Sequence, residues 1–186
     1  MDPTKLLEAD HRKVESLFSQ IARAKGAKRS PLIKELAKSL DAHMKLEETV
    51  VYPAMKAVTG KEPVQEGVTE HELARKSLAE MLALAPDKPG FGAALAAVKA
   101  GIAHHVKEEE GEVFPKLRRD GKKILDNIST PFMQTRLELG MPMDAAALAS
   151  SATKDELLAE ARSAGIEGTT TMTKDELAKA LVAVMN

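Results

Sequence analysis

A short motif occurs twice in this chain and limits the folds that the sequence can adopt. The first copy runs from His43 to Pro53 and the second from His105 to Pro115. Both copies read His-x-Lys-x-Glu-Glu and end on Val-aromatic-Pro at the same offsets. Because a helix turns about 100° per residue, a histidine and a glutamate four positions later lie on one face. Each copy therefore predicts a His–Glu pair on one side of a helix.

Both pairs fall within the apolar stripe that a packed helix buries. The first stripe reads Leu36, Leu40, His43, Glu47, Val50 or Val51, Ala54, Val58, and the second reads Leu95, Val98, Ile102, His105, Glu109, Val113, Leu117. A buried carboxylate is costly unless positive charge lies beside it. Neither stripe carries a lysine or arginine between its apolar ends. We therefore expect metal ions to balance these carboxylates.

The composition and the spacing of apolar residues predict an all-α protein. Ala, Leu, Val and Met supply most of the apolar content of the 186 residues, and runs of alternating β-branched residues are absent. Amphipathic helices are expected over about 4–25, 31–59, 62–84 and 91–118, with kinks at the two repeated prolines. Short breaks between long helices favour an up-down-up-down four-helix bundle built from two repeated hairpins.

Each expected helix places one histidine in its apolar stripe, and two helices add a glutamate. The resulting candidate ligands are His11, His43, Glu47, His71, His105 and Glu109. These six groups are too many for one tetrahedral zinc ion, but they suit a dinuclear centre in which Glu47 and Glu109 bridge and the histidines are terminal ligands. The chain has no cysteine, so imidazole and carboxylate ligands leave iron, manganese or zinc as candidates.

Several alternatives stay open at this point. A single His-x-x-x-Glu pair is usually a surface contact, and a bundle whose histidines bind nothing is the structural alternative. His104 and Glu108 form a competing pair, which we expect at the surface or behind the ligands. Tyr52 and Phe114 occupy equivalent positions, so packing is the first role for both. The phenol of Tyr52, if it lies near a metal ion, is also a candidate electron donor or extra ligand, which makes Tyr52 a candidate catalytic residue.

The region after the bundle divides into two further segments. We expect an extension and linker over 121–152, with helices near 122–127 and 131–139, and a small helical module over 153–186. The residues that define its pattern are Leu157, Ala161, Gly165, Ile166, Gly168, Met172, Lys174, Leu177 and Leu181. In this pattern the module is similar to the N-terminal helical module of transcription terminator Rho and its SAP-like relatives. Acidic side chains outnumber basic ones there, which argues against nucleic acid and favours a protein partner or oligomerisation.

The charge of the whole chain sets limits on its partners. With 27 basic and 28 acidic residues, the formal net charge of −1 gives no general attraction to nucleic acid or to an acidic membrane surface. The first residues lack an apolar stretch of secretory length, and no later window is apolar enough to span a bilayer. We therefore expect a cytoplasmic protein without a membrane partner.

The order of the candidate ligands resembles the hemerythrin-like (HHE cation-binding) domain over about residues 5 to 118. The resemblance rests on the six candidate ligands and on Pro53 and Pro115. It implies a non-haem centre of two iron ions (Fe2+/Fe3+, oxo- or hydroxo-bridged) that meets dioxygen, hydrogen peroxide or nitric oxide. It also implies that Glu47 and Glu109 are the bridging carboxylates, with manganese or zinc less favoured.

The departures from that pattern bear on function. Oxygen-carrying hemerythrins have a second histidine and a more distant aspartate where this chain has Arg75 and Glu109. With one histidine fewer, open positions on the irons favour turnover over reversible carriage. We therefore expect a catalase-like or peroxidase-like oxidoreductase that acts on hydrogen peroxide in oxidative-stress defence. The alternative is reversible binding or sensing of dioxygen, nitric oxide or iron.

Overall fold

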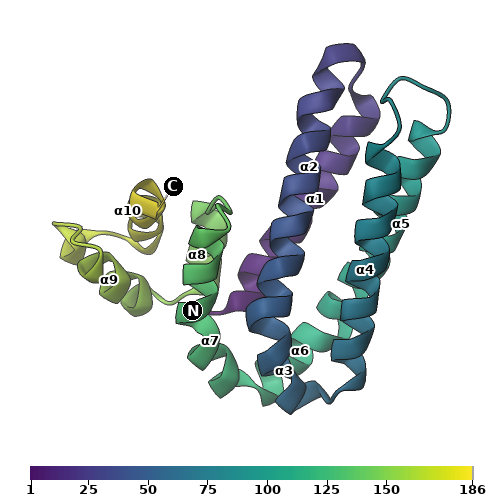
Figure 1. The fold of residues 1–186 in the computed structure, drawn as a ribbon. Helices are drawn as coiled ribbons and strands as arrows, with labels where there is room; N and C mark the ends of the chain where they lie inside the picture. The colour runs from purple at the N-terminus through teal and green to yellow at the C-terminus, as the bar shows by residue number, and fades with distance from the viewer. Residues whose placement is uncertain (186) are drawn as a thin grey trace.

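A computed structural model describes residues 1–185, which fold into helices without a strand in that range. Four long rods form an up-down-up-down bundle, as Figure 1 shows, and this confirms the predicted all-α architecture. α1 packs on α2 and α4 packs on α5, so each half is a helical hairpin. The bundle helices are α1 (Pro3–Arg23), α2 (Arg29–Leu46), α3 (Tyr52–Thr59), α4 (Glu62–Leu82), α5 (Phe91–Glu108) and α6 (Phe114–Asp120).

Local sequence signals account for where these helices begin and end. Asp2 caps α1 by accepting a hydrogen bond from the Thr4 amide at 2.9 Å, and Pro3 takes the first helical position. α3 ends at Gly60, whose φ of +92° is a conformation that favours glycine. A short 3-10 turn, η1 (Gly26–Lys28), connects α1 to α2.

The two repeated prolines distort their helices in a way that the sequence did not specify. The expected kink takes the form of a π-helical turn, η2 (Glu47–Val51) before α3 and η3 (Glu109–Val113) before α6. In each turn the amide of the aromatic residue donates to the carbonyl of the glutamate five positions earlier. Such wide turns concentrate at functional sites. Here each one begins at a candidate bridging glutamate.

The extension beyond the bundle is more regular than the sequence suggested. It comprises α7 (Lys122–Glu138), α8 (Ala145–Ser151), α9 (Lys154–Ser163), a 3-10 turn η4 (Thr169–Thr171) and α10 (Lys174–Met185). The predicted break within α7 is wrong, because Pro131 lies inside one continuous helix. Pro131 is exposed, so the carbonyl that loses its amide partner can bond to water instead.

Two apolar clusters fill the interior, and the candidate ligands lie between them. One cluster lies toward the loop between α1 and α2 and includes Val14, Phe18, Leu36 and Ile102. The other combines bundle residues such as Leu7 and Phe114 with buried residues of α7, α8, α9 and α10. The bundle and the extension therefore share one continuous core. Within residues 1–185, none of the helices has the length and apolar character needed to cross a membrane.

Candidate metal centre

All six predicted ligand side chains converge in the middle of the bundle. They come from α1 (His11), α2 (His43), the start of η2 (Glu47), α4 (His71), α5 (His105) and the start of η3 (Glu109). Their exposed fractions range from 0% for Glu47 to 4% for His43, His105 and Glu109. The predicted convergence of four imidazoles and two carboxylates in one buried layer is therefore present in the structure.

The four imidazoles form two pairs. Nε2 of His11 lies 3.1 Å from Nε2 of His43, and Nε2 of His71 lies 3.2 Å from Nε2 of His105. We call these pairs the His11/His43 half-site and the His71/His105 half-site. Two imidazole nitrogens that face each other at this distance repel unless a proton or a cation lies between them. Each pair thus presents two inward nitrogen donors of the kind that bind transition metals.

The two carboxylates lie between the half-sites. Oε2 of Glu47 lies 3.3 Å from Nε2 of His43 and 3.2 Å from Nε2 of His71. Oε2 of Glu109 lies 3.5 Å from Nε2 of His11 and 3.5 Å from Nε2 of His105. Each carboxylate therefore contacts one imidazole from each half-site. This is the placement that a carboxylate bridging two cations requires.

The carboxylates themselves provide a direct test of whether a metal fits. Within the described residues, neither oxygen of Glu47 has a hydrogen-bond partner, and Oε2 of Glu109 also lacks one. Burial alone would raise the pKa of Glu47, but the imidazoles, with His43 first among them, hold this pKa well below its usual value. A buried, ionised carboxylate without hydrogen bonds is unfavourable. A bound cation would satisfy these oxygens, so the residues present fit a metal centre.

A second set of carboxylates orients the imidazoles from behind. Nδ1 of His11, His71 and His105 lies 2.8 to 2.9 Å from Glu110, Glu48 and Glu70, respectively. Nδ1 of His43 lies 3.7 Å from Oδ2 of Asp10, which is a charge contact beyond hydrogen-bond distance. When Nδ1–H donates to a carboxylate, the lone pair of Nε2 points inward, as in the carboxylate–histidine–metal triads of known metal sites.

Sequence reasoning missed these outer carboxylates, although the motif contained a signal. Glu48 and Glu110 are the second residues of the repeated Glu-Glu, and Asp10 and Glu70 directly precede His11 and His71. Each acid therefore adjoins a candidate ligand in the chain. It contacts a histidine of a different helix, so the sequence alone did not pair them.

Arg75 occupies the position at which the resemblance to oxygen carriers predicts a second histidine. It donates to both oxygens of Glu48 at 2.9 Å, and Glu48 in turn accepts from Nδ1 of His71. Burial opposes ionisation of Glu48, but Arg75 and His71 together lower its pKa. Arg75 thus supports the orientation of a candidate ligand and offers no lone pair to a metal.

The paired aromatic residues stack on one imidazole in each half-site. The ring of Tyr52 lies 5.3 Å from that of His71, and the ring of Phe114 lies 6.0 Å from that of His11. The phenol oxygen of Tyr52 is 3.1 Å from Nε2 of His71, the inward nitrogen. Burial, followed by the surrounding carboxylates, raises the pKa of Tyr52 well above its usual value. The phenol is therefore protonated and directed at the centre.

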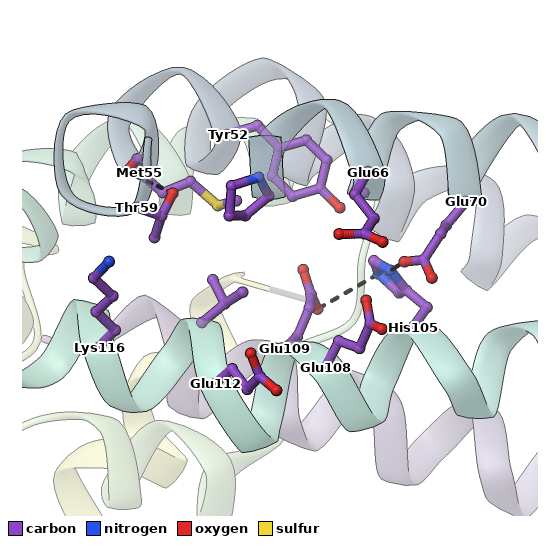
Figure 2. A pocket seen from close by; sticks show the side chains of 13 residues that line it. Tyr52, Met55, Thr59, Glu66, Glu70, His105, Glu108, Glu109, Glu112 and Lys116 are labelled. Carbon is purple, nitrogen blue, oxygen red and sulfur yellow. Dashed lines mark hydrogen bonds and ion pairs between the residues drawn. The ribbon is translucent and has the colours of Figure 1, made fainter. Parts of the chain in front are cut away.

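A cavity of about 200 Å³ connects the His71/His105 half-site with the surface (Figure 2). It lies between α4 and the continuous rod that α5, η3 and α6 form. Its inner wall includes His105, Glu109 and Tyr52. Its other acidic lining residues are Glu66, Glu70, Glu108 and Glu112.

His104 lies outside the centre, as predicted. Its side chain is 63% exposed and pairs with Glu108 at 3.2 Å and with Glu70 at 3.4 Å. Because Glu70 also contacts Nδ1 of His105, this carboxylate links His104 to the centre.

The arrangement agrees with comparisons to known proteins. The family model "Hemerythrin HHE cation binding domain" matches residues 2–117, and the chain therefore belongs to this family. Its members bind cations through such a domain, which agrees with the buried His–Glu cluster of this bundle.

Individual relatives extend this picture to the fold of the whole chain. A crystal structure of a hemerythrin HHE cation binding domain-containing protein from Mycobacterium kansasii is similar at a TM-score of 0.62 and 20% identity, covering 97% of this chain and 99% of that one. Its fold therefore includes counterparts of the bundle and the extension. A DNA nickase from Nostoc sp. is 26% identical over 116 residues, which are 62% of this chain and 33% of the nickase. The chain thus spans about a third of that relative.

Proposed function

We propose that this chain binds two iron ions in the buried His–Glu cluster and decomposes hydrogen peroxide. The observation that carries the proposal is the placement of each carboxylate, Glu47 and Glu109, against imidazoles of both half-sites. His11 and His43 would hold one ion, His71 and His105 would hold the other, and the carboxylates would be shared. A bound pair of iron ions supplies two-electron redox chemistry and positions for a small ligand.

The proposed reaction balances without an external reductant. One molecule of hydrogen peroxide is oxidised to dioxygen and gives up two electrons and two protons. A second molecule accepts those electrons and protons, its O–O bond breaks, and two molecules of water form. A catalase-like cycle of this kind needs no organic cofactor.

The residues around the cavity suit peroxide as the substrate. Hydrogen peroxide is small and neutral, so the glutamates that line the cavity do not repel it, whereas they disfavour anions. The protonated phenol of Tyr52 lies at the inner wall and can donate a hydrogen bond from Oη to a peroxide oxygen. The outer carboxylates keep the imidazoles in a fixed orientation while hydrogen peroxide is converted.

The test is oxygen evolution from hydrogen peroxide by iron-loaded protein, compared with the same concentration of free iron. Iron-loaded wild type should be much faster, and His105→Ala should lose the activity together with the iron of its half-site. Metal content is measured in the same samples. A wild-type rate no higher than that of free iron would rule out the enzymatic proposal.

A sensing role for dioxygen, nitric oxide or iron is the second candidate. It is favoured by the extension, because α7 and α8 pack directly on the bundle that contains the centre. Tight, reversible ligand binding with slow peroxide turnover would select this role.

DNA nicking is not proposed, since the match to the nickase covers a third of that protein and the net charge of −1 gives no general attraction to DNA.

A further inference from the structure

Arg136, on α7, is buried to an unusual degree for an arginine. Its exposed fraction is 2%, and its two terminal nitrogens pair with the two oxygens of Asp10. The Nη2···Oδ1 distance is 3.0 Å, and the guanidinium also lies over the ring of Phe132. Arginine is almost never fully buried without such a partner. The pair therefore joins α7 of the extension to Asp10 on α1 of the bundle.

Asp10 is also the carboxylate behind one of the candidate ligands. Its Oδ2 lies 3.7 Å from Nδ1 of His43, whose Nε2 belongs to the His11/His43 half-site. The pair with Arg136 keeps the negative charge of Asp10 beside this imidazole. A continuous chain of contacts thus runs from α7 through Asp10 to an inward imidazole.

We infer that the extension is a working part of the metal centre, with Arg136 as a positioning residue. Arg136 fixes the carboxylate of Asp10, and the charge of Asp10 beside Nδ1 of His43 favours the tautomer and orientation that present Nε2 to a metal. The inference rests on the proposed metal binding and assigns a role to residues outside the matched domain. It predicts that a disturbance of α7 changes metal binding in the His11/His43 half-site first.

Two observations separate this role from a purely structural one. A buried ion pair adds little net stability compared with apolar residues of the same volume, so stability alone gives no reason for an arginine here. The outer carboxylates Glu48 and Glu110 are held by Arg75 and Arg12, which lie within the bundle. Asp10 is instead held by Arg136 of α7, a helix that lies beyond the family domain, which ends at residue 117.

The experiment is a titration of the metal-free, full-length protein with Co2+, followed by its visible absorption spectrum. Wild type should bind two equivalents. Arg136→Met, which keeps the volume and removes the charge, should weaken one equivalent by about 10- to 100-fold, the usual effect of losing an outer-layer partner. Glu70→Gln should weaken the other equivalent by a similar factor, and the two variants should alter different parts of the spectrum.

Leu125→Ala is the matched control on the same helix. Leu125 is 4% exposed and packs in the core shared by the bundle and the extension, so its truncation should lower the melting temperature. It leaves Arg136 and Asp10 in place, and both Co2+ affinities should remain at the wild-type values. Arg136→Lys, which keeps the charge but loses the two-point contact, should partly restore the weakened site.

Each outcome of the Co2+ titration supports the role of Arg136 or overturns it. Wild-type affinities and spectrum in Arg136→Met would overturn the inference and leave the metal centre intact. Equal weakening by Leu125→Ala would also overturn it, because the effect would then follow stability. If wild type binds fewer than two equivalents, the proposed dinuclear centre fails first. Should Arg136→Met not fold, Asp10→Asn is tested in its place, with the same affinities required to change.

Discussion

The two half-sites are built from the same repeated motif but have different surroundings. In the His71/His105 half-site a tyrosine stacks on the imidazole and a cavity reaches the inner face. In the His11/His43 half-site a phenylalanine takes the equivalent position, and Arg136 of α7 holds the carboxylate behind the site. The repeat thus supplies symmetric ligands. Differences outside the ligands make one half-site accessible and tie the other to the extension.

This asymmetry suggests a division of labour within one centre. The half-site beside the cavity is suited to meet a small substrate, because Tyr52 and the acidic lining lie there. The half-site beside α7 is suited to hold its metal firmly or to respond to the extension. Chemically identical ligands can therefore serve different purposes, since the groups behind a ligand influence its affinity and reactivity.

The largest effect is expected for Glu47→Ala, which removes the carboxylate shared by both half-sites. Loss of a direct ligand should exceed the roughly 10- to 100-fold loss in affinity that accompanies loss of an outer partner. Both metals should therefore be lost after purification, together with peroxide turnover. Metal analysis of the variant checks this, with Glu66→Gln at the cavity as a control that keeps both metals. Retention of one full equivalent would show that the half-sites are independent.

A reciprocal exchange of the aromatic residues tests the chemical side of the comparison. Tyr52→Phe should retain both metals but lower the peroxide rate by about 100-fold, because it removes a hydrogen-bond donor directed at the substrate. Phe114→Tyr places a hydroxyl at a position that is 0% exposed, which should cost about 1–3 kcal/mol of stability without raising the rate. Initial rates and thermal melting separate the two effects. An unchanged rate in Tyr52→Phe would assign Tyr52 to packing.

Gly67→Ala should disturb the accessible half-site alone. A Cβ at this position would lie 2.7 Å from the phenol oxygen of Tyr52 and 2.9 Å from its Cζ, so the ring must move. Alanine favours a helix over glycine by about 1 kcal/mol, which offsets part of the resulting strain. We expect a small change in melting temperature and a rate that falls toward that of Tyr52→Phe. Gly101→Ala, with open space around its Cβ, is the matched control.

The smallest effect is the release of protons when metal binds. Burial alone would lower the pKa of His11 and of His105, but neighbouring carboxylates raise these values to about 9 and about 10. Both imidazoles are thus protonated near pH 7 in the metal-free chain, and a metal must displace one proton from each half-site. Affinity should rise as the pH increases toward 9 to 10. Calorimetry in buffers of different ionisation enthalpy should show that about two protons are released when both metals bind. If no proton is released, His11 and His105 are not protonated in the metal-free chain.

Much of the centre was predictable because its ligands interrupt an apolar pattern. His43 and Glu47 stand four residues apart in a stripe of Leu and Val, and a buried acid at that spacing needs a cation. The outer carboxylates were not predicted, because each adjoins one candidate ligand in the chain and contacts a histidine of a different helix in space. Arg136 gave no signal at all, since a single arginine in an amphipathic helix is usually exposed.

Helical periodicity converts spacing directly into a shared face, so the spacing of residues predicted the bundle helices, their repeated order and the six inward side chains. The pairing of each acid with its imidazole, and the contact of Tyr52 with His71, are apparent only in the folded molecule. The same is true of the contact of α7 with Asp10 and of the π-helical turns that precede the prolines. These features depend on contacts between residues far apart in the chain or on the precise path of the backbone, and the local pattern specifies neither.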